Sequence, residues 1–243
     1  MKQLQIFATT LAFGGILLLF SACNSAGDKK GTDAVVNTDS STVPKTEVPT
    51  KPASLMIIKH KVTDFDKWLT GFEAHDSMRK VYGLHSYGVS RGVDDKNMVM
   101  VALKIDDINR AKEFAALPDL KTAMQKSGVV GDPSIMYFDR QVLFLSNNDP
   151  SMRVMISHTV KDWDAWKKEF DNHKQARTDA GLTDRAVGYE LGNNKTAIIV
   201  DVVSNLAKAR EFFNSKDLKD RMQVAGVNGA PELFFYNLIK TYK

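Results

Sequence analysis

The chain contains one sequence pattern twice, at a fixed spacing of 98 residues, the distance from His60 to His158. The run His-x-Val-x-Asp-x-Asp-x-Trp begins at each of these histidines, and Gly-Val-x-Gly-x-Pro begins at Gly128 and again at Gly226. Two units of about 80 residues are longer and fewer than the units of a solenoid array. The spacing therefore predicts two copies of one small fold.

The first residues are predicted to be a targeting signal rather than part of either copy. Lys2 precedes an apolar run at 6–20, which is too short for a comfortable membrane span. Small residues directly before a lone cysteine, Cys23, resemble a bacterial lipoprotein signal. The resemblance implies that residues 1–23 are a signal peptide and that Cys23 is lipidated, which anchors the protein in a membrane of the bacterial cell envelope, on the periplasmic or outer-membrane side. An uncleaved anchor or an ordinary secretory signal is the alternative.

Residues 24–53 are predicted to form a disordered tether, because they are rich in small polar residues and show no apolar periodicity. Cys23 is the only cysteine, so the chain has neither an internal disulfide nor a zinc–cysteine site. The net charge of +4 is small, and no Lys/Arg stripe with interleaved aromatic residues is present, which argues against nucleic-acid binding. The expected partner is the lipid bilayer, reached through the acyl anchor.

Each copy is predicted to fold in the order β-α-β-β-α-β. In the first copy residues 56–62 alternate as a strand does, and Asp64 or Asp66 can cap the helix that follows. Gly83 is expected to end this helix in a left-handed conformation. Two strands joined by a hairpin, a second helix and a last strand follow, at 84–91, 98–105, 106–128 and 135–138.

This order is that of the ferredoxin-like plait. The two runs above, together with Phe-x-x-His-x-x-x-Arg, resemble the dimeric α/β-barrel superfamily, which includes antibiotic-biosynthesis-monooxygenase-like proteins, stress-responsive barrel proteins and many small uncharacterised ones. The resemblance covers residues 55–240 and implies an α+β fold of two tandem plaits that pair as an intramolecular barrel. A sheet with helices on one face has a second apolar face to bury. We therefore expect a monomer with a pseudo-dimeric barrel, made of a first repeat at 54–140, a connector at 141–151 and a second repeat at 152–240.

The first helix of each copy carries a stripe of aromatic and polar residues: Trp68, Phe72, His75 and Arg79, repeated as Trp166, Phe170, His173 and Arg177. Polar groups on such a stripe need partners when they are buried. We interpret the stripe as structural, with Arg79 paired to a carboxylate such as Asp66 or Glu113, or with His75 tying helix to strand. A duplicated binding site would repeat in the same way, so both interpretations stay open.

The positions at which the copies differ are better candidates for a site. His85, Tyr87 and Arg91, expected on one face of a strand, become Thr183, Arg185 and Tyr189, and Leu103 becomes Asp201. A mid-strand acid needs a counter-charge, which Arg185 could supply. If these faces line the barrel, its interior is asymmetric and partly polar, as binding sites tend to be. With the mid-strand histidines, which could equally be buried and hydrogen-bonded, the candidate ligand-binding residues are His60, His158, His85, Tyr87, Arg185, Tyr189 and Asp201.

No motif in the chain names a reaction. The histidines show no i, i+4 pair, so no metal site is predicted, and neither a nucleophile elbow nor a Gly-rich phosphate loop is present. The first hypothesis is an envelope lipoprotein that binds a small apolar or aromatic ligand in the barrel, without a resident cofactor. The resemblance alone suggests a second, a cofactor-independent monooxygenase-like or haem-handling enzyme with His60, His85 or His158 as base or axial ligand. The third is a structural lipoprotein with a filled barrel.

Overall fold

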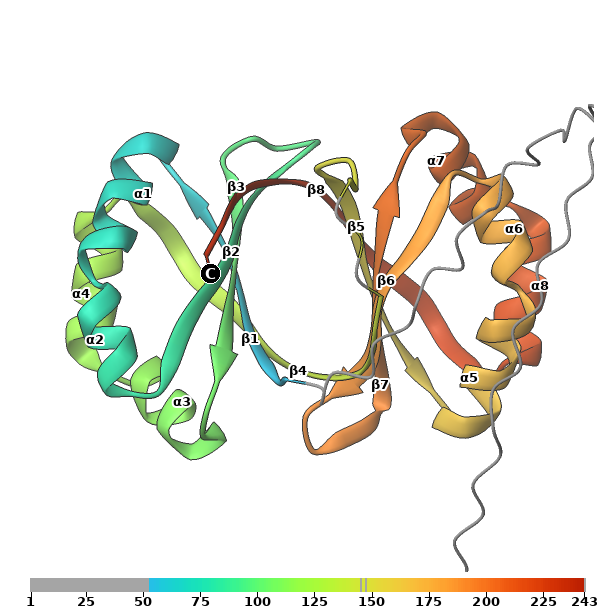
Figure 1. Cartoon of the computed structure of the whole chain (residues 1–243), viewed down its shortest axis with the longest axis horizontal. Helices are drawn as coiled ribbons and strands as arrows, with labels where there is room; N and C mark the ends of the chain where they lie inside the picture. Colours follow the sequence, from blue (N-terminus) through green and yellow to red (C-terminus); the bar gives the residue numbers. More distant parts are fainter. Residues whose placement is uncertain (1–52, 145, 147, 243) are drawn as a thin grey trace, which may run out of the picture. The chain divides into compact units, whose positions relative to one another are not determined.

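Each copy of the repeat folds as a strand, a helix pair, two strands, a second helix pair and a last strand (Figure 1). The computed structural model describes residues 53–144, 146 and 148–242, so the predicted signal peptide, Cys23 and nearly all of the tether lie outside the described residues. Repeat 1 consists of β1 (Leu55–Val62), α1 (Phe65–Ala74), α2 (Asp76–Val81), β2 (Leu84–Gly92), β3 (Met98–Ile105), α3 (Ile108–Ala115), α4 (Pro118–Lys126) and β4 (Val129–Leu143). Repeat 2 consists of β5 (Met152–Val160), α5 (Trp163–Asn172), α6 (Lys174–Asp179), β6 (Leu182–Glu190), β7 (Asn193–Val203), α7 (Leu206–Asn214), α8 (Lys216–Val224) and β8 (Val227–Thr241).

The first helix of each repeat begins at a predicted cap but is broken near its middle. The Asp64 carboxylate accepts a hydrogen bond from the backbone N–H of Lys67, at 2.7 Å. The predicted single helix of repeat 1 then divides into α1 and α2 at His75. The His75 ring nitrogen Nδ1 lies 2.8 Å from the carbonyl of Gly71, which the backbone N–H of His75 would bind in a continuous helix. Gly83, at φ 66°, ends α2 in the left-handed conformation, as predicted.

The eight strands form one closed barrel in the order β1-β3-β2-β8-β5-β7-β6-β4. The last strand of each repeat joins the two sheets because it is long enough to pair twice. The first part of β4 pairs with β1, and its end, from Phe138 to Leu143, pairs with β6 of the other repeat. Likewise β8 pairs with β5 and then with β2. Closure leaves no free sheet edge, and it confirms the predicted intramolecular barrel.

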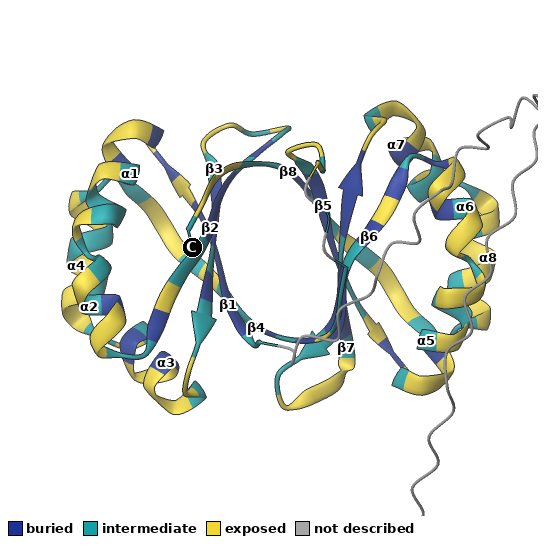
Figure 2. Ribbon diagram, in the orientation of Figure 1, coloured by how far each residue is buried: buried dark blue, intermediate teal, exposed yellow. Residues whose placement is uncertain are grey.

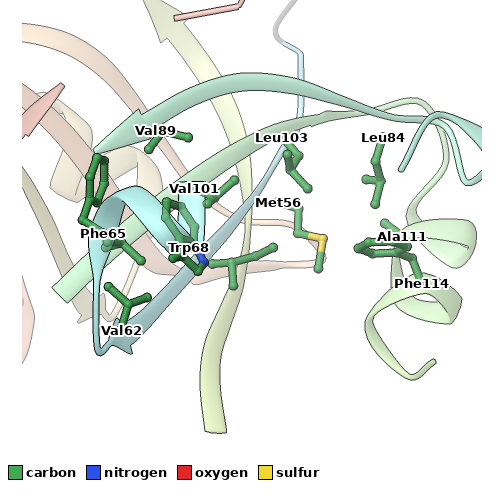
Figure 3. Packing of buried hydrophobic residues seen from close by; sticks show 12 residues of the cluster. Met56, Val62, Phe65, Trp68, Leu84, Val89, Val101, Leu103, Ala111 and Phe114 are labelled. Carbon is green, nitrogen blue, oxygen red and sulfur yellow. The ribbon is translucent and has the colours of Figure 1, made fainter. Parts of the chain in front are cut away.

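The helices cover the outer face of each sheet, so the described residues bury three separate cores (Figures 1 and 2). Figure 3 shows the core between the helices and the sheet of repeat 1, where Met56, Trp68 and Leu103 pack together with Phe114. Repeat 2 has an equivalent core. The third core lies on the barrel side of the two sheets and consists of Leu55, Ile57, Met100, Phe138, Met155, Ala186, Ile198 and Tyr236.

A β-bulge in the second strand of each repeat changes which side chains face the barrel. The register shifts between Ser86 and Gly88 in β2, and between Asp184 and Ala186 in β6. An extra residue reverses the alternation of a strand beyond the bulge. The prediction that His85, Tyr87 and Arg91 share one face is therefore wrong.

The two faces divide these residues as follows. Tyr87 and Arg185 point into the barrel. Arg91 lies over the Phe65 ring on the helix side, with 4.3 Å from its Cζ to the ring centre. Tyr189 also lies on the helix side, edge-on to Trp163, with ring centres 4.9 Å apart.

Candidate functional site

Three partly open cavities among the described residues are candidates for holding a small molecule. Two lie between the helices and the sheet, one in each repeat, with volumes of about 250 Å³ in repeat 1 and 140 Å³ in repeat 2. The third lies inside the barrel and has a volume of about 170 Å³. The barrel cavity lies where the sequence predicts a ligand, and ligand binding there stays a prediction, whereas the sequence did not predict the two inter-layer pockets.

The lining of the inter-layer pocket of repeat 2 is mostly apolar, and its polar members are His158, Glu169, Asn172, His173, Arg177, Asp201 and Arg221. The His158 ring lies edge-on to Trp166 with centres 5.4 Å apart and an interplanar angle of 63°. Both nitrogens of the His158 ring are buried without a hydrogen-bond partner in the described part of the chain. Burial lowers the pKa of His158 to about 4, so its ring is neutral at pH 7. The apolar lining includes Ile156, Phe170, Ile199, Phe212 and Phe213.

Asp201 lines the same pocket and is 0% exposed. Neither carboxylate oxygen has a hydrogen-bond partner among the described residues. Burial, and then the negative charge of Asp184, raises the pKa of Asp201 to about 7, while Arg177 acts in the opposite direction. A carboxyl group with this pKa is poised to gain or lose a proton near neutral pH.

Arg185 does not serve as the counter-charge of Asp201, contrary to the prediction. Asp201 pairs in register with Asp184, which faces the helices, and the bulge that follows directs Arg185 into the barrel. The nearby buried ion pair is instead Arg177 with Asp184, with Nε–Oδ1 and Nη2–Oδ2 distances of 2.9 and 3.0 Å. This fork occupies the guanidinium and leaves Asp201 unpaired.

The inter-layer pocket of repeat 1 has the same frame without the second acid. Leu103 occupies the position of Asp201, and Ser86 that of Asp184. The buried Arg79 pairs through Nη2 with Asp76 of α2, at 3.3 Å, and not with Asp66 or Glu113 as predicted. The acid that neutralises the buried arginine thus lies on a helix in repeat 1 and on a strand in repeat 2.

The arginines of the helical stripe also stabilise the fold through contacts with its phenylalanines. Cζ of Arg79 and of Arg177 lies 3.8 and 3.5 Å from the ring centres of Phe72 and Phe170. Each guanidinium also donates to the carbonyl of that same phenylalanine, at 2.7 and 2.6 Å. His75 bonds within its own helix and so does not tie helix to strand.

The remaining histidine candidates are His173, which lines the pocket of repeat 2, His60, which lines the pocket of repeat 1, and the exposed His85. Nε2 of His173 lies 3.2 Å from the carboxylate of Asp217 in α8. His85 is exposed, and its Nε2 lies 2.8 Å from the Asp106 carboxylate. His60 lines the pocket of repeat 1, and burial lowers its pKa to about 4.

The barrel cavity contains two of the seven candidate residues, Tyr87 and Arg185. It also contains Arg140 and Arg153, which sequence reasoning missed. A comparison of the repeats would have found them, because their equivalents 98 residues away are Leu238 and Leu55.

Neither a metal nor a haem has a ready site. The described residues contain no group of three or more His, Cys, Asp or Glu that could hold a metal ion. As a separate point, no described helix is long and apolar enough to cross a membrane. Haem is at least as large as a drug-sized ligand, and pockets for such ligands have volumes of about 300–1,000 Å³. The inter-layer pockets are smaller, with volumes of about 250 and 140 Å³. The rings of His60 and His158 are packed edge-on to tryptophans, so the residues present do not fit a haem in this conformation.

Comparison with known proteins shows the fold but not the activity. No family model and no curated protein matches the sequence. An anthrone oxidase-like protein of known structure is 13% identical, with a TM-score of 0.52, over 81% of this chain and 95% of that one. A proposed monooxygenase from Fusobacterium nucleatum is 14% identical, with a TM-score of 0.50, over 78% and 93%. A haem-binding protein from Thermus thermophilus is 11% identical, with a TM-score of 0.47, over 82% and 95%. The chain has the ferredoxin-like fold of the dimeric α/β-barrel proteins, with both halves of the barrel in one polypeptide.

Proposed function

We propose that the protein binds a small, largely apolar molecule in the inter-layer pocket of repeat 2, where the ligand donates a hydrogen bond to Asp201. The observation that carries this proposal is the fully buried carboxylate without a hydrogen-bond partner among the described residues, in the lining of a mostly apolar cavity. An unsatisfied buried polar group costs about 1–3 kcal/mol, and more when it is charged. A ligand with one donor group offsets that cost, and a purely apolar ligand does not.

The size of the pocket limits the ligand. A volume of about 140 Å³ is close to that of an apolar protein cavity known to bind benzene, about 150 Å³. Asp201 is opposite Val154 of β5, and His158 follows Val154 by four residues on β5, so the backbone positions of Asp201 and His158 are about 13 Å apart along the sheet. One benzene-sized ligand therefore reaches Asp201 or His158 but not both. A ring with a single hydroxyl or amino group, such as phenol or aniline, matches the pocket at Asp201.

Calorimetric titration with phenol and with toluene tests the proposal, because the two differ in one donor group. Asp201→Leu should weaken phenol binding about tenfold or more relative to toluene binding, because leucine removes the hydrogen-bond acceptor while it takes the same pocket space from both ligands. Leu103→Met, at the equivalent position of repeat 1, is the matched control and should leave both affinities unchanged. Equal affinity of phenol for the protein and for Asp201→Leu would contradict the assignment.

A second candidate function is acid–base catalysis at Asp201. A pKa of about 7 suits a general base or acid near neutral pH. Proton abstraction from a bound phenol would be its first step, which is compatible with a cofactor-independent monooxygenase-like activity. Oxygen uptake that needs the bound ligand and is lost in Asp201→Asn would support this function, and uptake retained in that variant would refute it. A haem-handling activity predicts a Soret shift on adding haemin that is reduced in His60→Ala and His158→Ala, and the small pockets favour no shift.

We also propose that the protein works as a monomeric lipoprotein of the bacterial cell envelope. The support is the sequence pattern that ends at Cys23 and the closure of the barrel within one chain. Metabolic labelling with a palmitate analogue should label the protein and fail in Cys23→Ser. Analytical ultracentrifugation of the purified protein should give the mass of one chain.

A further inference from the structure

The barrel cavity gathers three arginines on the inside of a closed sheet. Arg140 of β4 is 4% exposed, Arg153 of β5 is 7% exposed, and the side chain of Arg185 of β6 is 21% exposed. Tyr87 approaches them, with its hydroxyl 3.5 Å from Nη1 of Arg140. The rest of the lining is mostly apolar and includes Leu55, Ile57, Met100, Ala102, Met155 and Val200.

The positive charge of this cluster is not balanced by the described residues. Asp149 is the one described carboxylate within ion-pair distance, 3.7 Å from Nη2 of Arg153 and 3.7 Å from Nη1 of Arg185. Arg140 has no ion pair in the described part of the chain, and its Nε donates to the carbonyl of Ala53 at 2.8 Å. Three guanidinium groups and one carboxylate leave two positive charges in excess. Burial lowers the pKa of Arg153, which indicates the cost of keeping it charged there.

The two repeats supply an internal control for what the fold itself needs at these positions. The equivalents of Arg153 and Arg140 are Leu55 and Leu238, which line the same cavity. The equivalent of Arg185 is Tyr87. Neighbouring lining pairs keep their class: Ile57 with Met155, Met100 with Ile198, and Ala102 with Val200. Leucine and tyrosine therefore suffice to build the barrel wall, and arginine stands at three of the equivalent positions around one cavity.

We propose that the barrel cavity is a second binding site, which takes a small organic carboxylate with an apolar body. Arginine guanidinium groups bind carboxylates through paired, charge-assisted hydrogen bonds. The apolar lining requires a body that buries carbon against it, which inorganic phosphate lacks. A volume of about 170 Å³ limits the ligand to about the size of benzoate. This site lies on the opposite face of the sheets from Asp201 and is independent of the function proposed above.

Calorimetric titration of the purified protein at low ionic strength tests the site with four compounds. Benzoate and hexanoate should bind, whereas benzamide, which has the same shape as benzoate but no charge, and inorganic phosphate should bind at least tenfold more weakly. Phosphate binding as tight as benzoate binding would overturn the organic carboxylate. Absence of binding by both carboxylates would overturn the site.

Each test variant replaces an arginine by the residue that occupies the equivalent position in the other repeat. Arg153→Leu and Arg140→Leu should each weaken benzoate binding about ten- to a hundredfold, the range for losing a charge-assisted hydrogen bond. Both variants should fold, because removing a buried charge in excess is neutral or stabilising, and thermal unfolding without ligand checks this. Arg110→Leu, on the exposed face of α3, is the control that changes the net charge equally and should leave binding unchanged. An equal loss in Arg110→Leu would show a general charge effect and overturn the assignment.

Discussion

Replacing Asp201 by leucine should stabilise the protein at neutral and alkaline pH. The carboxylate is 0% exposed and has no partner among the described residues. Leucine fills the equivalent position in repeat 1 as Leu103, which is also 0% exposed. The pocket beside Asp201 leaves room for the larger side chain. The substitution therefore removes a desolvated charge without the overpacking that an enlarged core residue usually causes.

The size of the effect follows from the pKa of Asp201, which burial raises from 3.8 to about 7. Because the native state holds this proton more tightly than the unfolded state, the group favours folding below pH 3.8 and loses that contribution as the pH rises through 7. Each pKa unit corresponds to about 1.4 kcal/mol, so the full loss is about 4 kcal/mol. Between pH 5 and pH 8 it is about 3 kcal/mol.

Urea unfolding of the protein and of Asp201→Leu at pH 5, 6, 7 and 8 measures this contribution, since the other titrating groups cancel in the difference. The stability advantage of the variant should grow by about 3 kcal/mol over this range. Asp132→Asn, which changes a side chain that is 89% exposed, is the control and should give a constant difference. If the difference in free energy of unfolding between Asp201→Leu and the unchanged protein stays constant between pH 5 and pH 8, Asp201 is not a buried carboxylate without a partner.

Three further predictions follow from the same structure. Burial lowers the pKa of His60 and of His158 from 6.5 to about 4, so each histidine should cost about 2–3 kcal/mol of folding stability as the pH falls from 7 to 4.5. In urea unfolding, the double variant His60→Phe, His158→Phe should therefore lose less stability over this pH range than the unchanged protein. Arg177→Met should destabilise the protein by about 3–5 kcal/mol, because it leaves Asp184 buried and unpaired, and adding Asp184→Ser should recover part of that loss. Residues 53–144 alone should dimerise or aggregate in analytical ultracentrifugation, because the end of β4 loses its partner strand; a folded monomer would contradict the barrel pairing.

The repeat pattern was enough to predict the fold, because its signals are local and occur twice. Asp64 caps a helix, Gly83 takes a left-handed conformation, and a plait with one uncovered apolar face needs a second sheet. The faces of individual strands were predicted less well. An alternating pattern assigns Tyr87 and Arg91 to one face, and only the hydrogen-bond register reveals the bulge that separates them.

The candidate site was predicted only in part for the same reason. Asp201 was recognised from its difference to Leu103, but its pocket depends on which sheet face the helices cover. The assignment of Arg185 as its partner assumed that neighbouring strands place these side chains on one face. The bulge in β6 puts them on opposite faces, so the two members of one predicted ion pair line two separate cavities.

The duplication separates what the fold needs from what it does not need. The ion pair of a buried arginine is present in both repeats, although its acid lies on α2 as Asp76 in one and on β6 as Asp184 in the other. Because the buried arginine has an acidic partner in both repeats, although on different elements, we interpret this ion pair as part of the fold. Asp201 and the barrel arginines behave differently, because the other repeat builds the same wall with leucine or tyrosine and needs no charge there. The fold can omit these charges, and they lower its stability where they are buried without a full partner, which is why we propose that a ligand supplies the missing partner at each site.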